Sequence, residues 1–435
     1  MIKKLSLVLF AILAFNLHAQ ESTTSPYSFY GIGSLKFKGT AENVSMGGLS
    51  IYIDSTHINL RNPASYTGNN LKVSGYNNES RPVKFAVGGG HSSVSLKTDN
   101  ASDKATSTTF DYLALSFPMG KFGAGFGIMP YSSVGYKLES YEGDVLDNRY
   151  SGEGGVNKVF AGIGYQITDN LSIGVDASYN FGSITNSSIK YVYDDEGELI
   201  AYQSRETNKS ELSGLNYNIG LSYKPMISEK LQMVMGATYS PSSDLTSENE
   251  RIFATIVITE SGQELPVNEI EADLASLGLD ETILTLPART SFGLGIGEEY
   301  KWFIGGEYTL LKTSEFSNRI FDIENASFED ASSFSIGGFY IPQHTSFNNY
   351  FKRVVYRAGV RFENTGLKIN NESINEFGIS FGVGLPVGGL FSNTNLGVEF
   401  GQRGTTAQNL VQENFINFQI SLSLNDRWFV KRKYL

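Results

Sequence analysis

Residues 416–424 read Ile-Asn-Phe-Gln-Ile-Ser-Leu-Ser-Leu, so that apolar and polar side chains alternate without a break. Successive side chains of a β-strand point to opposite faces, and this stretch therefore predicts a strand with one apolar and one polar face. The same alternation runs through residues 171–179, 215–223 and 395–401. A soluble sandwich alternates too, so one such strand does not separate a membrane barrel from a secreted sandwich.

The length of these segments and the position of their aromatic residues favour the membrane. They run to about ten residues, as a tilted bilayer-spanning strand requires, and aromatic residues fall near their ends, where aromatic girdles lie. Between Leu71 and Leu424 there are about fourteen or fifteen such segments, and bacterial single-chain barrels use even numbers of strands. We predict an all-β protein, a transmembrane antiparallel β-barrel of about fourteen strands, with Ile416 to Leu424 as the closing strand and both chain ends in the periplasm.

Residues 1–19 have the layout of a secretory signal peptide. Lys3 and Lys4 precede an apolar run over residues 5–17, and Ala19 offers a cleavage site. The run is too short for a membrane-spanning helix. After it, no stretch approaches the roughly 18 consecutive apolar residues that a spanning helix needs. We therefore expect export, cleavage after Ala19 and insertion into the outer membrane.

Composition excludes several classes of function. The chain has no cysteine, which rules out disulfides, thiol catalysis and thiolate metal sites. Its formal net charge of -11 would repel nucleic acid, whose binding depends on neutralising phosphates. No nucleic-acid partner is expected.

Residues 20–70 do not look like barrel wall. The alternation fails there, and Gly31, Gly33, Gly47 and Gly48 interrupt the chain. A barrel of this size leaves an interior that side chains alone do not fill. We predict that Ser25 to Ser65 folds inside the lumen as a hatch; the alternative is an ordinary periplasmic tail.

The rest of the chain, residues 71–435, is expected to form the barrel with long extracellular loops. One polar loop is expected at about 194–211 and a longer one at about 241–287. Within the second, Ile270, Leu274 and Leu277 fall at near-helical spacing, which predicts a short amphipathic helix between residues 268 and 284.

Several motifs occur in an order that resembles the FadL-type outer-membrane transporters of long-chain fatty acids and aromatic hydrocarbons. They are Met46–Asp54 followed by Asn62-Pro63-Ala64, then residues 122–126 and 131–136, residues 165–174, and residues 286–316. Residues 25–28 and 428–433 resemble a Bacteroidetes subgroup of these barrels. The resemblance implies a hatch whose motif is Asn62, Pro63 and Ala64. It also implies ligands that enter from outside and leave sideways through a break in the wall.

Met129, Pro130 and Tyr131 are the candidate lateral gate. Opening a wall requires lost strand–strand hydrogen bonds, and proline cannot donate one. Residues 122–128 alternate regularly until Met129 and Pro130 interrupt them. The alternative is a strand that simply ends above the membrane at Pro130.

Charged residues that alternate with apolar ones are predicted to face the lumen, because a charge facing lipid is costly. These candidates are Asp176, Glu307, Arg357, Arg361, Glu376 and Glu399. They would pair with each other or with the hatch, and holding the hatch is a plainer role for them than binding a ligand headgroup.

No catalytic, cofactor or metal site emerges, and we expect a protein that is not an enzyme. His57, His91 and His344 are widely spaced and lack paired ligand geometry. The glycines at 123, 125 and 127 have a period of two, which indicates one face of a strand and not a nucleotide loop. Residues 194–197 could hold calcium, but their spacing matches no calcium loop and favours a solvated loop.

The resemblance to FadL-type barrels and to their Bacteroidetes subgroup implies two alternative function classes. The first is a passive channel for hydrophobic small molecules, with outer-membrane lipids or detergent-like hydrophobic compounds as ligands. The second is a closed barrel acting as a subunit of a type IX secretion translocon or a barrel-assembly complex, with outer-membrane protein partners.

Overall fold

The computed structural model describes residues 23–54, 56–67, 83–259, 261–316, 325–387 and 392–426. The expected signal peptide at 1–19 and the motif at 428–433 lie outside these ranges. Among the described helices, none has the length and apolarity needed to cross a membrane.

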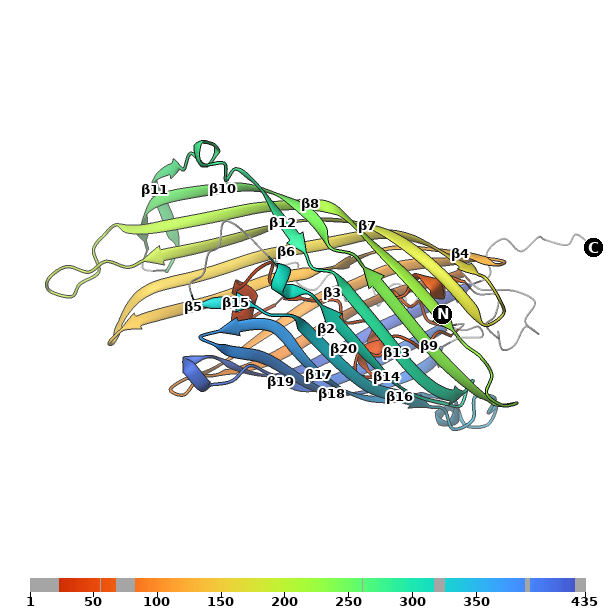
Figure 1. Ribbon diagram of the computed structural model, residues 1–435. Helices are drawn as coiled ribbons and strands as arrows, with labels where there is room; N and C mark the ends of the chain where they lie inside the picture. Colours follow the sequence, from red (N-terminus) through yellow and green to blue (C-terminus); the bar gives the residue numbers. More distant parts are fainter. Residues whose placement is uncertain are drawn as a thin grey trace, which may run out of the picture.

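The strands of the described chain close into one antiparallel barrel of fourteen wall strands (Figure 1), which confirms the predicted fold class. The last strand, β20 (Gln412–Asp426), pairs with the first, β2 (Val83–Lys97), from Val83↔Asp426 to Lys97↔Gln412. The prediction that Ile416 to Leu424 closes the barrel is therefore confirmed.

Most wall strands are continuous. Besides β2 and β20 they are β3 (Ser102–Met119), β6 (Val145–Gln166), β7 (Leu171–Lys190), β8 (Gln203–Tyr223), β14 (Trp302–Leu311), β16 (Ala331–Tyr340), β17 (Val355–Ile369), β18 (Glu372–Val387) and β19 (Ser392–Arg403). The other wall strands consist of two pieces with a proline at the break. They are β4 (Phe122–Pro130) with β5 (Ser132–Glu142), β9 (Leu231–Ser240) with β10 (Ser243–Ile258), and β12 (Glu281–Leu286) with β13 (Arg289–Glu298).

The alternation read from the sequence sorts side chains between lipid and lumen. On β20, Ile416, Phe418 and Ile420 are exposed on the outer face, whereas Phe415, Ser421 and Ser423 are buried on the inner face. The same division holds along the neighbouring ladders, since residues directly opposite one another share a face. The barrel therefore presents an apolar band outward and a polar wall inward, as a membrane barrel does.

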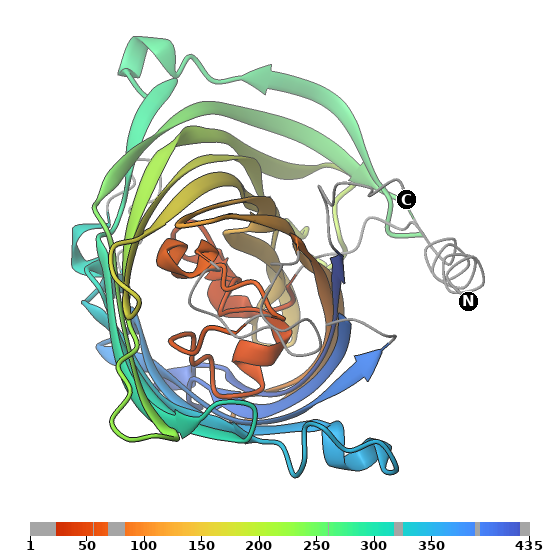
Figure 2. The ribbon, with the colours of Figure 1, turned by 90° about the vertical axis from the view of Figure 1, so that its right-hand side faces the viewer.

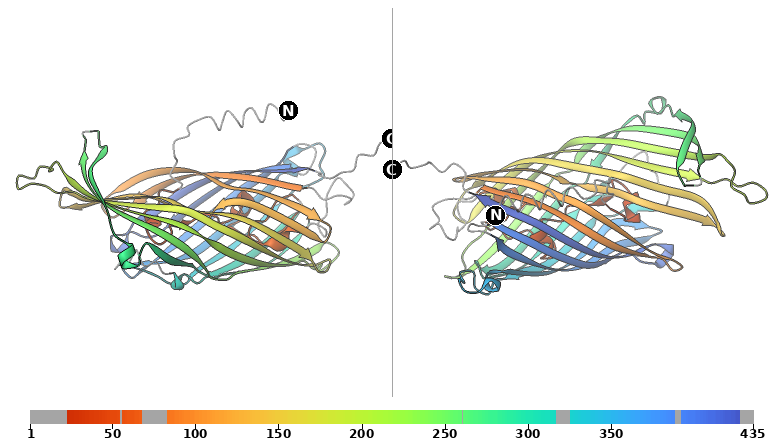
Figure 3. Two further views of the ribbon diagram at one scale, coloured as in Figure 1. Left: turned by 90° about the horizontal axis from the view of Figure 1, so that it is seen from above. Right: turned by 180° about the vertical axis from the view of Figure 1, so that it is seen from behind.

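One side of the barrel continues well beyond a bilayer. β6 has 22 residues, β7 has 20 and β8 has 21, about twice the length that a spanning strand needs. These strands and β10 extend past the rim, where β11 (Glu264–Glu271) pairs with β10 (Figures 1 and 3). The end of the barrel with long strands and loops is extracellular by the usual rule for such barrels, and the opposite end is periplasmic.

The segment over residues 241–287 differs from the expected polar loop with a helix. It consists mainly of β10, β11 and β12, and its helical part is the single turn η3 (Ala275–Leu277). The physical reason is cross-strand pairing: Leu245 lies opposite Leu284, and both are buried. Similarly, the loop expected at 194–211 ends where β8 begins at Gln203.

Residues 23–67 run through the inside of the barrel (Figure 2). This hatch contains η1 (Pro26–Phe29), β1 (Ser34–Leu35), α2 (Ala41–Val44) and η2 (Pro63–Tyr66). Outside it, the rim carries β15 (Ala326–Phe328), η4 (Thr313–Glu315) and η6 (Ala407–Asn409), and η5 (Tyr350–Arg353) lies in the loop between β16 and β17.

Candidate functional site: hatch, wall break and lumen

The motif Asn62-Pro63-Ala64 forms the start of η2 and contacts the wall. The Asn62 Oδ1 atom accepts a hydrogen bond from the Ala64 backbone N–H at 3.0 Å, which caps the turn. Its Nδ2 atom donates to the Leu221 carbonyl of β8 at 3.0 Å. One side chain thus shapes the hatch turn and attaches it to the barrel.

Glycines on the inner wall make room for this turn. A Cβ atom at Gly123, Gly174 or Gly220 would lie under 3.0 Å from backbone or side-chain atoms of residues 62–67. Real Cβ atoms essentially never approach so closely, so these positions require glycine for close approach of the hatch. Two of the period-two glycines of β4, Gly123 and Gly125, therefore form part of the seat of the hatch.

A second glycine seat holds the segment that follows α2. Cβ atoms at Gly337 of β16 and Gly359 of β17 would each lie under 3.0 Å from the backbone of Met46. The backbone N–H of Gly47 donates to Ser380 Oγ of β18 at 2.9 Å. Backbone packed against backbone leaves no space between the hatch and this part of the wall.

A buried ion-pair network joins the hatch to β17, β18 and β19. The Arg361 Nη2 atom lies 2.6 Å from Glu376 Oε1 and 2.7 Å from Glu399 Oε1. Glu376 also binds Arg403, and Lys38 of the hatch pairs with both Glu376 and Glu363. The network satisfies each buried charge with a partner of opposite sign, as buried charges require.

Glu307 and Asp176 connect the hatch to other strands. Glu307 of β14 accepts a hydrogen bond from the Ser50 backbone N–H at 2.8 Å and pairs with Arg61 at 2.7 Å. Asp176 of β7 accepts one from Asn218 at 2.9 Å, and Asn218 also donates to the Arg61 carbonyl at 3.2 Å. Every charge predicted to face the lumen is buried inside the barrel: Asp176, Glu307, Arg357, Arg361, Glu376 and Glu399.

Two lysines that the sequence reasoning missed also hold the hatch. The Lys84 Nζ atom donates to the carbonyl oxygens of Asp54 and His57, at 2.7 and 2.9 Å. Lys224 donates to the Ile53 carbonyl at 2.6 Å. Lys84 lies on the same strand face as Ala86, so its position in the alternation of β2 could have identified it.

The wall is broken beside Pro130. β3 pairs with β4 from Met119↔Phe122 to Leu113↔Ile128, and in the described chain no strand pairs with that edge of β3 beyond this point. On one side, β5 pairs with β6. On its other side its first residues pair with the hatch strand β1, through Ser34↔Ser133 and Leu35↔Ser132.

The hatch supplies hydrogen bonds that a neighbouring wall strand would otherwise make. The Lys36 backbone N–H donates to the Tyr131 carbonyl at 3.0 Å, and Ser28 Oγ accepts from the Gly135 N–H at 3.1 Å. Of the candidate gate residues, Met129 is buried, Pro130 ends β4, and Tyr131 begins the contact with the hatch. The hatch therefore lies directly against the break.

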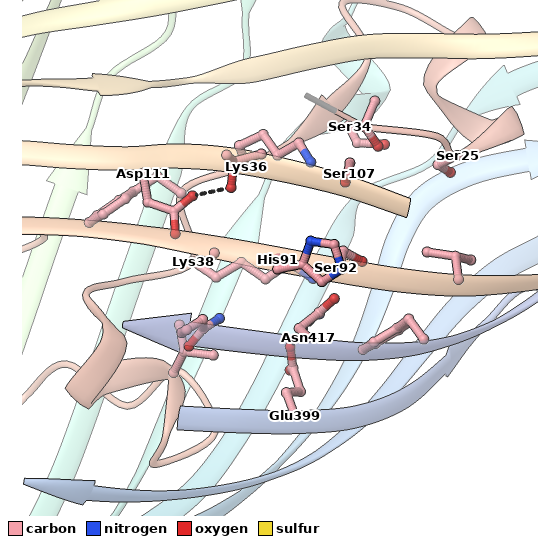
Figure 4. A pocket seen from close by; sticks show the side chains of 18 of the residues that line it. Ser25, Ser34, Lys36, Lys38, His91, Ser92, Ser107, Asp111, Glu399 and Asn417 are labelled. Carbon is pink, nitrogen blue, oxygen red and sulfur yellow. Dashed lines mark hydrogen bonds between the residues drawn. The ribbon is translucent and has the colours of Figure 1, made fainter. Parts of the chain in front are cut away.

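A cavity of about 150 Å³ lies beside the break (Figure 4). Lys36 and Lys38 of the hatch, Asp111 of β3 and Glu399 of β19 line it together with Pro130. Asp111 is the extra residue of a β-bulge in β3, opposite Gly88 and Gly89 of β2. Burial lowers the pKa of Lys36 to about 8, and the Arg403 charge adds to this effect.

The histidines lie apart. His57 Nδ1 bonds to Asp54 Oδ2 at 2.7 Å, His91 bonds to Thr108 at 2.9 Å, and the His344 ring contacts that of Tyr300 in a tilted arrangement. Among the described residues, no group of three or more His, Asp or Glu side chains is arranged to hold a metal ion.

In the loop over residues 194–197, the Asp194 side chain accepts hydrogen bonds from the backbone N–H groups of Glu196 and Glu198 and so closes its own turn.

Solved structures of outer-membrane channels share the fold of this chain. The Pseudomonas putida toluene transporter TodX is 15% identical, with 89% of this chain and 99% of that chain covered and a TM-score of 0.58. The Ralstonia pickettii toluene transporter TbuX is 14% identical, with 91% and 99% covered and a TM-score of 0.55. A Pseudomonas aeruginosa FadL homologue is 11% identical, with 90% and 99% covered and a TM-score of 0.57. At these identities the likeness establishes the fold.

The closed barrel and its internal hatch define the class by fold: an outer-membrane β-barrel with the fold of these channels. Within that class, the model of the BamG family matches residues 1–435, and the chain belongs to the BamG family. No curated protein matches its sequence.

Proposed function

We propose that this chain is a passive outer-membrane channel for hydrophobic small molecules, which leave the lumen sideways through the break between β3 and β5. The observation that carries the proposal is that the β3–β4 ladder ends at Leu113, beside the proline that ends β4, and that no strand of the described residues pairs with this edge of β3 beyond it. We further propose that the signal peptide is removed after Ala19.

The break lies beside the outer apolar band, which suits a hydrophobic ligand. Phe110 and Leu113 of β3 and Phe126 of β4 are exposed on the outer face next to it. An unpaired backbone group costs several kcal/mol in lipid, and the hatch hydrogen bonds remove part of this cost on the β5 side. Leu35 of the hatch is 42% exposed at the break, so the hatch presents an apolar side chain there.

Closing the break with a disulfide tests the gate. If the β3–β4 register continued past Pro130, Thr109 would lie opposite Ser132, and the chain has no native cysteine. In the variant Thr109→Cys/Ser132→Cys, oxidation is expected to reduce uptake of N-phenylnaphthylamine by cells at least tenfold, because the joined strands leave no exit. Reduction with dithiothreitol should restore it.

The matched control is Leu115→Cys/Phe126→Cys, which joins β3 and β4 where they already pair. Its oxidation should leave uptake unchanged. If the disulfide at the break forms, as seen by a shift on a non-reducing gel, and uptake still continues at the original rate, this site is not the gate.

A second candidate function is that of a closed barrel acting as a subunit of a type IX secretion translocon or a barrel-assembly complex. Membership of the BamG family and the close seating of the hatch on glycines favour it. Native purification followed by mass spectrometry separates the two candidates. Stoichiometric outer-membrane proteins would support the subunit, and bound hydrophobic compounds without such proteins would support the channel.

A further inference from the structure

The loop between β16 and β17, residues 341–354, is long for its end of the barrel. At this periplasmic end the turns over residues 120–121, 167–170 and 299–301 have two to four residues, whereas this loop has 14. Outer-membrane barrels usually have short periplasmic turns. The loop projects outward from the barrel wall (blue, lower right in Figure 2). It therefore extends beside the lipid-facing surface of the barrel.

The loop is folded on itself, so its exposed side chains have defined positions. The Gln343 backbone N–H donates to the Lys352 carbonyl at 2.7 Å, which joins the two halves of the loop. The Asn349 side chain accepts from the Phe351 N–H at 3.0 Å and caps η5. Val354 is buried where the loop meets β17. The loop is thus a built part of the barrel exterior.

Two tyrosines attach the part of the loop around Phe351 to the wall. Tyr356 of β17 lies on the outer face, because its neighbour Arg357 points into the lumen. Its hydroxyl donates to the Phe351 carbonyl at 3.2 Å. The Tyr350 hydroxyl donates to the Pro386 carbonyl of β18 at 3.1 Å. This part of the loop is therefore held at the periplasmic ends of β17 and β18, next to the outer face.

The side chains exposed there continue the aromatic girdle of the barrel. Tyr340 and Tyr356 lie opposite one another at the periplasmic ends of β16 and β17, and both are exposed on the outer face. Aromatic residues at this height mark the interface between lipid and water. Phe351, which Tyr356 holds, is 72% exposed, and Lys352 beside it is exposed too. An exposed aromatic ring that continues a lipid-facing surface indicates contact with the membrane.

The loop has two sides with different surroundings. His344, Phe347 and Arg353 line a cavity of about 410 Å³ at the periplasmic end of the lumen. Phe351 and Lys352 lie outside that lining. The ring of Phe351 and the ammonium group of Lys352 are therefore available to the exterior of the barrel, and the lumen does not account for them.

The charge of the loop suits a phospholipid surface. Residues 341–354 contain no aspartate or glutamate, although the whole chain has a formal net charge of -11. The Arg353 guanidinium lies over the Tyr350 ring, 5.3 Å from its centroid, which leaves Lys352 as the cation beside Phe351. A lysine stem can lie along apolar groups while its ammonium group stays in the polar headgroup region. Anionic lipids attract such a cation, and no carboxylate of the loop opposes them.

We propose that residues 341–354 form an interfacial loop that binds the phospholipids of the periplasmic leaflet. Phe351 inserts among the headgroups, and the Lys352 ammonium group contacts their phosphates. The loop thereby fixes how deeply this side of the barrel sits in the membrane. The inference goes beyond the proposed function, because it concerns the outside of the barrel and holds for a channel and for a subunit alike.

Single-cysteine labelling tests the position of Phe351, since the chain has no native cysteine. The variant Phe351→Cys carries an environment-sensitive fluorophore in nanodiscs of phosphatidylcholine and phosphatidylglycerol. Tyr202→Cys on the extracellular extension is the control in water, and Ile420→Cys on the outer face of β20 is the control in the bilayer. A nitroxide on the lipid headgroup is expected to quench the label at position 351 at least about threefold more than the label at 202, because interfacial side chains lie at headgroup depth. A nitroxide near the chain end should quench mainly the label at 420.

A second measurement tests Lys352 with acrylamide, a neutral quencher in water. In the labelled Phe351→Cys protein, adding Lys352→Gln is expected to raise the water-exposed fraction of the label about fivefold when phosphatidylglycerol is present, because one attractive charge is lost. In phosphatidylcholine alone the difference should be smaller. Lys230→Gln, an exposed lysine of the periplasmic turn over residues 224–230, is the matched control and should leave the quenching unchanged.

Resistance to unheated SDS confirms that each labelled variant is folded before it is measured. If the headgroup nitroxide quenches the label at 351 no more than the label at 202, Phe351 lies in water and the proposal is wrong; a periplasmic protein would then be the partner for its ring. If Lys352→Gln behaves as Lys230→Gln does, the contact between Lys352 and the phosphates is overturned. Neither measurement depends on transport through the wall break.

Discussion

Alanine at both Gly337 and Gly359 is expected to unseat the hatch while the barrel stays folded. The added methyl groups would each lie under 3.0 Å from the backbone of Met46, and a backbone cannot give way as a flexible side chain can. Overpacking of this kind costs about 1–3 kcal/mol per site. At about 1.4 kcal/mol per tenfold change, each substitution raises the fraction of molecules whose hatch is displaced from the wall about fivefold to over a hundredfold.

Limited trypsin digestion measures this effect, because Lys36 and Lys38 lie in the hatch and are only partly exposed. Faster cleavage after these residues, with a barrel that still resists unheated SDS, is the expected result. Gly306→Ala is the matched control: its added methyl group would meet no atom closer than 3.5 Å. Equal cleavage rates in the double variant and this control would show that the glycine seat does not hold the hatch.

Glu376→Gln is expected to give the largest loss of stability of any single substitution in the ion-pair network. Glu376 is 3% exposed and binds Arg361, Arg403 and Lys38. Removing its charge leaves three cations around a neutral amide, and breaking a buried pair in this way costs about 3–5 kcal/mol. The temperature at which the folded band is lost on SDS gels should fall, and Lys38 should become more accessible to trypsin.

Glu211→Gln provides the comparison, since Glu211 forms an exposed pair with Lys209 on the extracellular extension. Exposed pairs contribute about 0–1 kcal/mol, so this variant should behave almost as the wild type. If Glu376→Gln were as stable as Glu211→Gln, Arg361 and Arg403 would have to find other partners in the folded barrel, and the network would not hold the hatch.

The sequence determined which face of each strand meets lipid and which meets the lumen. That property is local, because alternation along a strand assigns every side chain to one of two faces. The closing strand at Ile416 to Leu424 and the inward positions of Arg361, Glu376 and Glu399 follow from it. Proline at 130 also marked the strand break, since the missing N–H is a property of the residue itself.

Only the tertiary structure decided what each inward residue contacts. Ser28 and Gly135 are 107 residues apart, and Lys38 and Glu376 are 338 apart, so no local pattern pairs them. The same reason explains why the 241–287 segment forms strands: Leu245 and Leu284 gain more from burial against each other than a short helix gains alone. The glycine seats likewise exist only once the hatch lies in the lumen, because they are defined by the surfaces that the hatch and the wall present to each other.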